Sequence, residues 1–325
     1  MRRSLRFLAC APLFAACAGA PPTATTEALA AAVPRASWVH MEVQPQQPPQ
    51  NPNGKAQAQP NGPQENAHAV CALLGPSSMG TLTRQVSHDA NGLVENVLQL
   101  VATITQGPPS QEGDGQATWF LDDGKSPVVH AFAIQAVAPD TFNFFLGAKP
   151  RGADDNAWQG LLGGEVNTAD PSGPVGNLAI NFGMIHNFDP NAEPETGGAA
   201  VQFGRSGDAR VVAMHLGGIS GKGAPPDDAD YQFAEHADGS GGFGFATRAD
   251  FDHDGTLDEL LHVQSAWQSN GLGQSHATVT GGSLGNRTVD AVECWTPSLA
   301  RVFYADDIGT PPTGNPLCCP QAPAQ

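Results

Sequence analysis

The chain has 325 residues, and its 15 Lys and Arg against 32 Asp and Glu give a formal net charge of −17. A protein this acidic is a poor nucleic-acid binder, because contacts to phosphates need clustered Lys and Arg. The same charge disfavours electrostatic contact with anionic lipid headgroups and suits the binding of divalent cations. The 38 Gly and 28 Pro residues favour turns over helices.

Residues 1–20 are predicted to be an export signal. Three Arg residues give a basic start, and the apolar run from Leu5 to Phe14 is too short to span a membrane as a mature helix. Phe14-Ala-Ala-Cys17 resembles a bacterial lipobox, in which the cysteine is lipidated and becomes the mature N-terminus. The resemblance implies a lipid anchor on Cys17, and Ala18 at the next position implies sorting to the outer membrane.

Two alternatives to this anchor remain open. An ordinary signal peptidase would cleave after Ala20 and leave Pro21 at the new terminus, which such enzymes resist. Lipidation at Cys10 is a poorer match. Both alternatives keep the protein in the cell envelope or beyond it, where disulfides persist.

Residues 21–75 are predicted to be a disordered tether. The stretch from Pro45 to Pro63 is almost entirely Pro, Gln, Asn, Gly and Ala, and it cannot bury enough apolar area to offset the entropy of ordering it. Residues 38–43 are a small apolar island that either pairs as a strand or is loose.

Residues 79–106 are predicted to form a helix. Ser77 or Ser78 can cap its start, and Gly107-Pro-Pro ends it. Apolar residues recur at helical spacing and predict one face that packs in a core. The predicted face consists of Leu82, Val86, Leu93, Val94, Val97, Leu98, Val101 and Ile104.

The rest of the chain has the pattern of short strands separated by turns. Many strands without intervening helices indicate antiparallel pairing. We therefore predict a mainly β fold, an antiparallel curved sheet or barrel of about a dozen strands with the N-terminal helix packed on it, in a single domain over residues 76–325. The predicted strands are 117–121, 128–137, 142–149, 157–166, 177–184, 199–203, 210–216, 231–236, 243–249, 259–267, 277–280, 289–295 and 301–304.

Four aspartates between residues 250 and 258 fall at positions 1, 3, 5 and 9 of a calcium-binding loop, with Gly255 at the sharp-turn position 6. The flanking residues alternate with period two, so the loop is predicted to join two strands. Leu261 stands where a bidentate Glu would complete the site, so the site should be weak. The predicted ligands of a structural Ca²⁺ are Asp250, Asp252, Asp254, the carbonyl of Thr256, and Asp258. An acidic turn that holds no ion is the alternative.

The stretch Ala249-Asp-Phe-Asp-His-Asp-Gly-Thr-Leu-Asp-Glu-Leu-Leu261 resembles the calcium loop of FG-GAP/VCBS-type extracellular repeats. Those families repeat the loop in each blade of a propeller, whereas it occurs once here. The resemblance therefore implies the ion and the turn, not the propeller.

Four cysteines lie outside the predicted signal: Cys71, Cys294, Cys318 and Cys319. Four cysteines allow three pairings. The adjacent pair, Cys318 and Cys319, is disfavoured because a bond between neighbours is strained. We expect one of these two to bond Cys294 and the other to reach Cys71.

The sequence contains no catalytic constellation that we can identify. The ten His are scattered singly, and the glycine-rich run at 239–244 precedes a strand, so it is a turn and not a dinucleotide site. The favoured function is therefore a non-enzymatic envelope lipoprotein with a structural or protein-binding role. A hydrolase is the least favoured of the functions considered.

Two further resemblances bear on function. The order of tether, helix and long sheet is similar to that of open half-barrels that carry lipids or lipoproteins across the periplasm. This similarity implies the alternative function, a carrier of an apolar ligand. The tail from Glu293 to Asp307 resembles that of uncharacterised myxobacterial-type lipoproteins and implies no activity.

Overall fold

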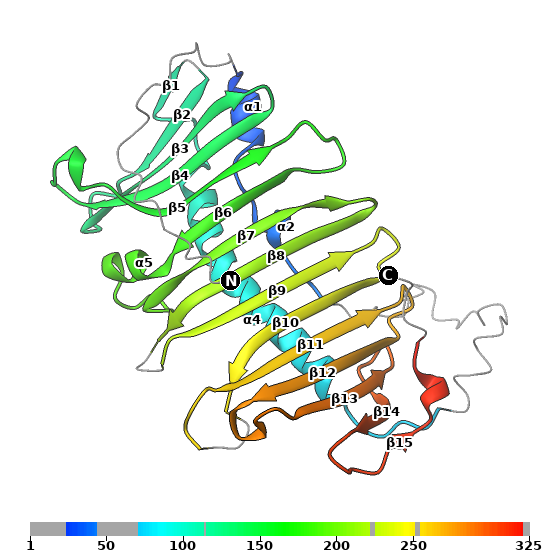
Figure 1. The fold of residues 1–325 in the computed structure, drawn as a ribbon. Coiled ribbons are helices and arrows are strands. Elements are labelled where there is room, and N and C mark those ends of the chain that lie inside the picture. Colours follow the sequence, from blue (N-terminus) through cyan, green and yellow to red (C-terminus); the bar gives the residue numbers. More distant parts are fainter. Residues whose placement is uncertain (1–23, 44–70, 114, 222–224, 251–253, 321–325) are drawn as a thin grey trace. The chain divides into compact units, whose positions relative to one another are not determined.

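The computed structural model describes residues 24–43, 71–113, 115–221, 225–250 and 254–320 (Figure 1). The predicted signal with Cys17, and the middle of the predicted tether, lie outside these residues. Contacts within the chain gather into two compact units, and each is described by itself. The first unit draws on Met1–Val39, Val94–Gly204 and Leu216–Pro226, and the second on His40–Leu93, Arg205–His215 and Asp227–Gln325.

The strands form one antiparallel sheet of 15 strands, in which each strand pairs with its neighbours in the sequence (Figure 1). The order runs from β1 to β15 without closing among the described residues, so the curved open sheet is confirmed and the barrel is not. The strands are β1 Gln111–Gly113, β2 Gln116–Leu121, β3 Val128–Ala138, β4 Thr141–Pro150, β5 Gln159–Asn167, β6 Val175–Asn181, β7 Thr196–Ser206, β8 Ala209–Ser220, β9 Asp227–Glu235, β10 Gly241–Ala249, β11 Glu259–Trp267, β12 Gly273–Gly281, β13 Thr288–Trp295, β14 Arg301–Asp306 and β15 Thr313–Gly314.

Each predicted strand overlaps an observed one, with errors of type at the ends of two strands. Residue 157, predicted as strand, ends the 3₁₀ turn η1 (Asp155–Ala157). Residues 182–184, predicted as strand, begin the helix α5 (Phe182–Phe188). The side chain of Asn181 accepts a hydrogen bond from the backbone amide of Met184 at 3.0 Å and so caps this helix. The short edge strands β1 and β15 were not predicted. Three 3₁₀ turns complete the secondary structure: η1 Asp155–Ala157, η2 Gly282–Leu284 and η3 Pro316–Cys318.

The predicted helix is confirmed as α4 (Ser78–Ile104). Ser77 is its cap, because the Ser77 hydroxyl accepts a hydrogen bond from the amide of Gly80 at 2.9 Å. None of the described helices is long and apolar enough to cross a membrane.

The predicted buried face of α4 is wrong over the first half of the helix. Leu82 is 38% exposed, and Val86 and Leu93 are only half-buried. The side chains buried in their place are polar: Thr83, Ser87 and Asn91. From Val94 onward the prediction is correct, since the side chains of Val97, Leu98, Val101 and Ile104 are buried.

The prediction of a tether is wrong for residues 24–43. The helices α1 (Thr26–Ala31) and α2 (Ala36–Val39) form here, and Leu29 is buried. Thr25 caps α1 by accepting a hydrogen bond from the amide of Ala28 at 3.2 Å. The apolar residues of this stretch supply the buried area that the Pro- and Gln-rich stretch after it lacks.

The core of the first unit is aromatic and aliphatic, and alternating residues of β3 and β4 are part of it. Phe132, Ile134, Phe142 and Leu146 are at most 2% exposed. Phe132 and Phe144 are stacked with ring centroids 6.5 Å apart. This is the period-two burial that the sequence predicts.

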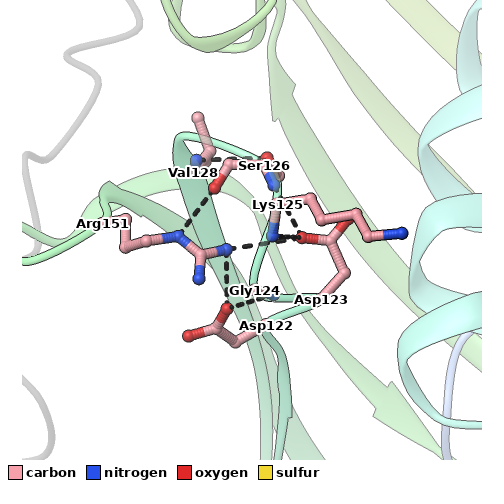
Figure 2. Close-up of polar contacts among 7 residues, drawn as sticks. All are labelled: Asp122, Asp123, Gly124, Lys125, Ser126, Val128 and Arg151. Atoms are coloured by element: carbon pink, nitrogen blue, oxygen red, sulfur yellow. Dashed lines mark hydrogen bonds and ion pairs between the residues drawn. The ribbon is translucent and has the colours of Figure 1, made fainter.

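A polar turn closes one end of this unit between β2 and β3 (Figure 2). The Asp123 carboxylate accepts the backbone amides of Ser126 at 2.7 Å and Lys125 at 2.8 Å. Arg151 lies 2.7 Å from the carboxylate of Asp122 and donates to the carbonyl of Ser126 at 2.8 Å. The amides of Ser126 and Lys125, together with the nearby Arg151, hold the pKa of Asp123 below its usual range.

The predicted disulfides are confirmed. Cys71 bonds Cys318 and Cys294 bonds Cys319, with Cα atoms 5.9 and 5.3 Å apart. The two adjacent cysteines thus join the C-terminal tail both to the segment before α4 and to β13. Cys294 and Cys318 are buried in a small apolar cluster with Val302.

Candidate functional site

The predicted calcium loop joins β10 to β11, as the alternating flanks predict, and Ala249 pairs with Glu259 across its base. The Asp250 carboxylate accepts the backbone amides of Asp254 at 3.0 Å and Gly255 at 3.1 Å. Gly255 has φ +91, a left-handed conformation that favours glycine at this turn position. Asp250 and Asp254 are thereby brought together at the start of the loop.

Asp254 is fixed in turn by Thr256. Its carboxylate accepts the Thr256 hydroxyl at 2.6 Å and the Thr256 amide at 2.8 Å. These two hydrogen bonds hold the pKa of Asp254 below its usual range, so the carboxylate is anionic over the whole physiological range.

Of the other predicted ligands, Thr256 lies beside Asp254, to which its amide and hydroxyl donate. Asp252 lies outside the described residues. Asp258 lies at the far end of the loop, where a Cβ added to Gly282 would meet its Oδ1 at 2.8 Å and Oε1 of Glu259 at 2.2 Å. Within the described part of the chain, no three His, Cys, Asp or Glu side chains are placed to hold a metal ion. Glu259, which is 1% exposed, is an acidic residue beside the loop that sequence reasoning missed.

A second polar site, which the sequence did not predict, lies at the start of α4. The carboxylate of Glu293 on β13 is fully buried and accepts the backbone amides of Met79 at 2.9 Å and Ser78 at 3.3 Å, and also the hydroxyl of Ser77. The guanidinium of Arg301 lies 3.7 Å away. A carboxylate at a helix N-terminus satisfies free amides and interacts favourably with the helix dipole. Glu293 therefore fixes where α4 begins against β13.

A chain of hydroxyl groups fixes α4 one and a half turns further on. The Thr83 hydroxyl lies 2.7 Å from that of Ser265 on β11, which also contacts the hydroxyl of Ser275 on β12. All three side chains are buried. Each hydroxyl hydrogen-bonds to the next, so none of these buried polar groups is left without a partner.

The helix also holds the segment that precedes the undescribed residues 44–70. The Asn91 side chain accepts the amide of Met41 and donates to its carbonyl, both at 2.8 Å. Arg210 on β8 donates to the carbonyl of His40 and pairs with Glu235 at 3.1 Å. Residues 40–43, the only described part of the predicted apolar island outside a helix, are thus anchored on α4 as an extended segment.

A cluster of acidic residues begins β9. Asp227 accepts the hydroxyl of Thr247 at 3.0 Å, and Asp230 pairs with His215 at 2.8 Å. Burial, and then the charges of Asp227, Asp89 and Asp230, raise the pKa of Tyr231 to about 12. Asp89, on α4, is thereby placed near β9.

No family model, curated protein or solved structure matches the chain.

Some of the site residues could be predicted from the sequence and others could not. The loop was found because calcium ligands recur at fixed offsets along the chain. Glu293 and Thr83 were missed, because their partners are 214 and 182 residues away in the chain and no local spacing marks them. Two signals were present in retrospect: a Glu amid strand residues, and small polar residues on the predicted helix.

Proposed function

We propose that the protein is a non-enzymatic lipoprotein of the cell envelope, whose folded body has a structural or protein-binding role. The observation that carries the proposal is that α4 is joined to β11 and β13 through matched polar groups. Thr83 meets Ser265, and Glu293 caps the helix. A carrier of an apolar ligand needs an apolar-lined cavity. Here polar side chains of the protein itself occupy the contact between α4 and the sheet, which favours a structural protein over a carrier.

The disulfides support a location in the cell envelope. Cys71–Cys318 and Cys294–Cys319 suit an exported protein, because cytosolic thiols are kept reduced. The lipid anchor on Cys17 rests on the lipobox resemblance alone. Replacing Cys17 with Ser should move the protein from the membrane to the soluble fraction, and unchanged fractionation would remove the anchor from the proposal.

Native mass spectrometry of protein taken from the envelope separates the structural body from the carrier. We expect the mass of the processed chain with its anchor and no further apolar molecule. A stoichiometric lipid that remains after gentle extraction, and that also remains on the Cys17→Ser variant, would favour the carrier.

We further propose that the loop at 250–258 binds a structural calcium ion weakly. Support comes from the loop-forming bonds of Asp250 and from the anionic Asp254. Calcium at ten times its dissociation constant should stabilise the folded state by roughly 1.4 kcal/mol. Magnesium should do much less, because it needs a smaller octahedral site.

The turn between β9 and β10 provides a matched control for this test. Asp238 accepts the amide and hydroxyl of Ser240 at 2.9 and 2.7 Å, the same pattern that Asp254 makes with Thr256. Asp254→Ala should abolish the calcium-dependent rise in melting temperature, whereas Asp238→Ala should keep it. If wild type melts at one temperature in excess calcium and in chelator, the loop is an acidic turn that holds no ion.

A further inference from the structure

A groove of about 760 Å³ runs between α4 and the anchored segment 40–43 in the second unit. The helix lines it with Thr81, Arg84 and His88, among others, and the segment lines it with His40 and Glu42. Its volume is in the range of small-molecule sites. Its lining is mostly polar, so it suits a polar ligand better than a lipid.

Both walls of the groove are fixed. Asn91 clamps Met41 through two hydrogen bonds of 2.8 Å, and the Met41 side chain is fully buried. The start of α4 is held by Glu293. The backbone of both walls is therefore positioned before any ligand arrives, which lowers the entropy cost of binding.

Two basic side chains of the helix wall have no partner among the described residues. Arg84 and His88 stand one turn apart, and neither side chain makes a hydrogen bond or ion pair with any described residue. Other arginines of this acidic chain are paired, such as Arg210 with Glu235 and Arg151 with Asp122. On the facing segment, Glu42 lies 3.5 Å from His40.

We propose that this groove binds the carboxylate group of a small polar ligand, with Arg84 as the residue that pairs with it. The guanidinium presents a planar fork of donors that matches a carboxylate in two parallel hydrogen bonds. One permanent cation, with Glu42 nearby and a net charge of −17 on the whole chain, suits a singly charged anion and disfavours a doubly charged one. The inference goes beyond the proposed function and does not rest on it.

The carboxylate can come from a free organic acid or from the C-terminus of a peptide. Titrations of the full-length protein, followed by amide chemical shifts in NMR, distinguish them with four probes: acetate, N-acetyl-triglycine, its C-terminal amide, and inorganic phosphate. We expect saturable shifts in the groove with the two carboxylates and none with the amide. Tighter binding of acetate indicates a free acid, and tighter binding of N-acetyl-triglycine indicates a peptide terminus.

Arg84→Ala should weaken carboxylate binding by about tenfold or more, since it removes a charge-assisted pair. Arg287→Ala is the matched control, because Arg287 is an equally exposed arginine of the same unit outside the groove. Unchanged melting temperatures would show that both variants fold. The proposal is overturned if neither carboxylate gives saturable shifts, if the amide binds as well as the acid, if phosphate binds more tightly, or if Arg287→Ala weakens binding as much as Arg84→Ala.

Discussion

Helix α4 is held by two different kinds of contact along its length. In the second unit, its buried positions are polar or small, and they meet Ser265, Glu293 and the backbone of Met41. In the first unit, the buried positions are aliphatic, and Val101 and Leu98 are at most 1% exposed. The same helix therefore uses directional hydrogen bonds in one half and non-directional apolar burial in the other.

The difference teaches what each contact contributes. Apolar burial supplies free energy in proportion to area but tolerates small shifts of the helix. Buried hydrogen bonds add less net free energy, yet they penalise every misplacement, because an unsatisfied buried group is costly. We infer that the polar half of α4 (residues 78–93) sets the register of the helix on the sheet. The aliphatic half (residues 94–104) supplies most of the stabilisation.

The largest expected effect comes from breaking the cap in the polar half. Glu293→Ala leaves two helix amides, the Ser77 hydroxyl and the charge of Arg301 without their partner. Loss of one member of a buried pair costs about 3–5 kcal/mol, so chemical denaturation should show a loss of that size. Glu293→Gln is the control, since it keeps one of the two acceptor oxygens and should lose less. Equal losses for the two variants would mean that the charge, and not the hydrogen bonding, anchors the helix.

Two glycines of α4 should respond to alanine with opposite signs. A Cβ at Gly80 would lie 2.7 Å from the Ser77 hydroxyl and 3.1 Å from the Trp295 ring, whereas a Cβ at Gly92 meets nothing within 4 Å. Gly80→Ala should therefore destabilise by about 1–3 kcal/mol, through overpacking. Gly92→Ala should stabilise by about 1 kcal/mol, through helix propensity. Thermal or urea unfolding measures both, and stabilisation by Gly80→Ala would contradict the tight fit against β13.

A reciprocal exchange of similar volumes sharpens the comparison. Thr83→Val removes a hydroxyl that Ser265 contacts, and should cost about 1 kcal/mol. Val101→Thr inserts a hydroxyl into the aliphatic half, and should cost about 1–3 kcal/mol if the hydroxyl finds no acceptor. Urea unfolding midpoints at equal slope would give both values. If Val101→Thr proves neutral, the second half of α4 is less tightly packed than its burial indicates.

The smallest expected effect is on the pKa of Tyr231, which lies near Asp89 in the polar half of α4. The chain has two tyrosines, so Tyr304→Phe leaves Tyr231 to be titrated alone by phenolate absorbance. Because the pKa of Tyr231 is raised to about 12, its contribution to stability is complete below the ordinary pKa near 10 and is lost as the pH rises through about 12. Asp89→Asn should lower this pKa. Ionisation near pH 10 in a folded protein would remove Tyr231 from the acidic cluster.

The sequence predicted most of the sheet, because period-two alternation and turn residues are local signals. Phe243 and Phe245 are buried and alternate with half-buried positions on β10, as expected. The disulfide pairing was predictable only in part, because the strain of a bond between Cys318 and Cys319 disfavours one of three pairings and leaves the other two open. The open form of the sheet was one of two forms predicted, since strand patterns do not determine closure.

The errors have a common physical cause. Apolar periodicity placed Leu82 and Val86 in the core, because it assumes that the facing surface is apolar. The facing strands instead carry Ser265 and Glu293, and their hydrogen bonds select Thr83 and Ser77 for burial. Likewise, the sequence predicts a tether over residues 24–43 because the partners that bury them lie far along the chain. Such long-range polar matching leaves no local pattern in the sequence.

Hydrogen exchange of the backbone amides of α4 tests the central claim most directly, namely that the polar half of the helix is a fixed part of the body. The account predicts that amides of residues 82–93 exchange as slowly as those of residues 94–104, because both halves open only when the protein unfolds. A helix that moves aside to admit an apolar ligand would open locally. Exchange in residues 82–93 that is orders of magnitude faster than in the aliphatic half would contradict the account.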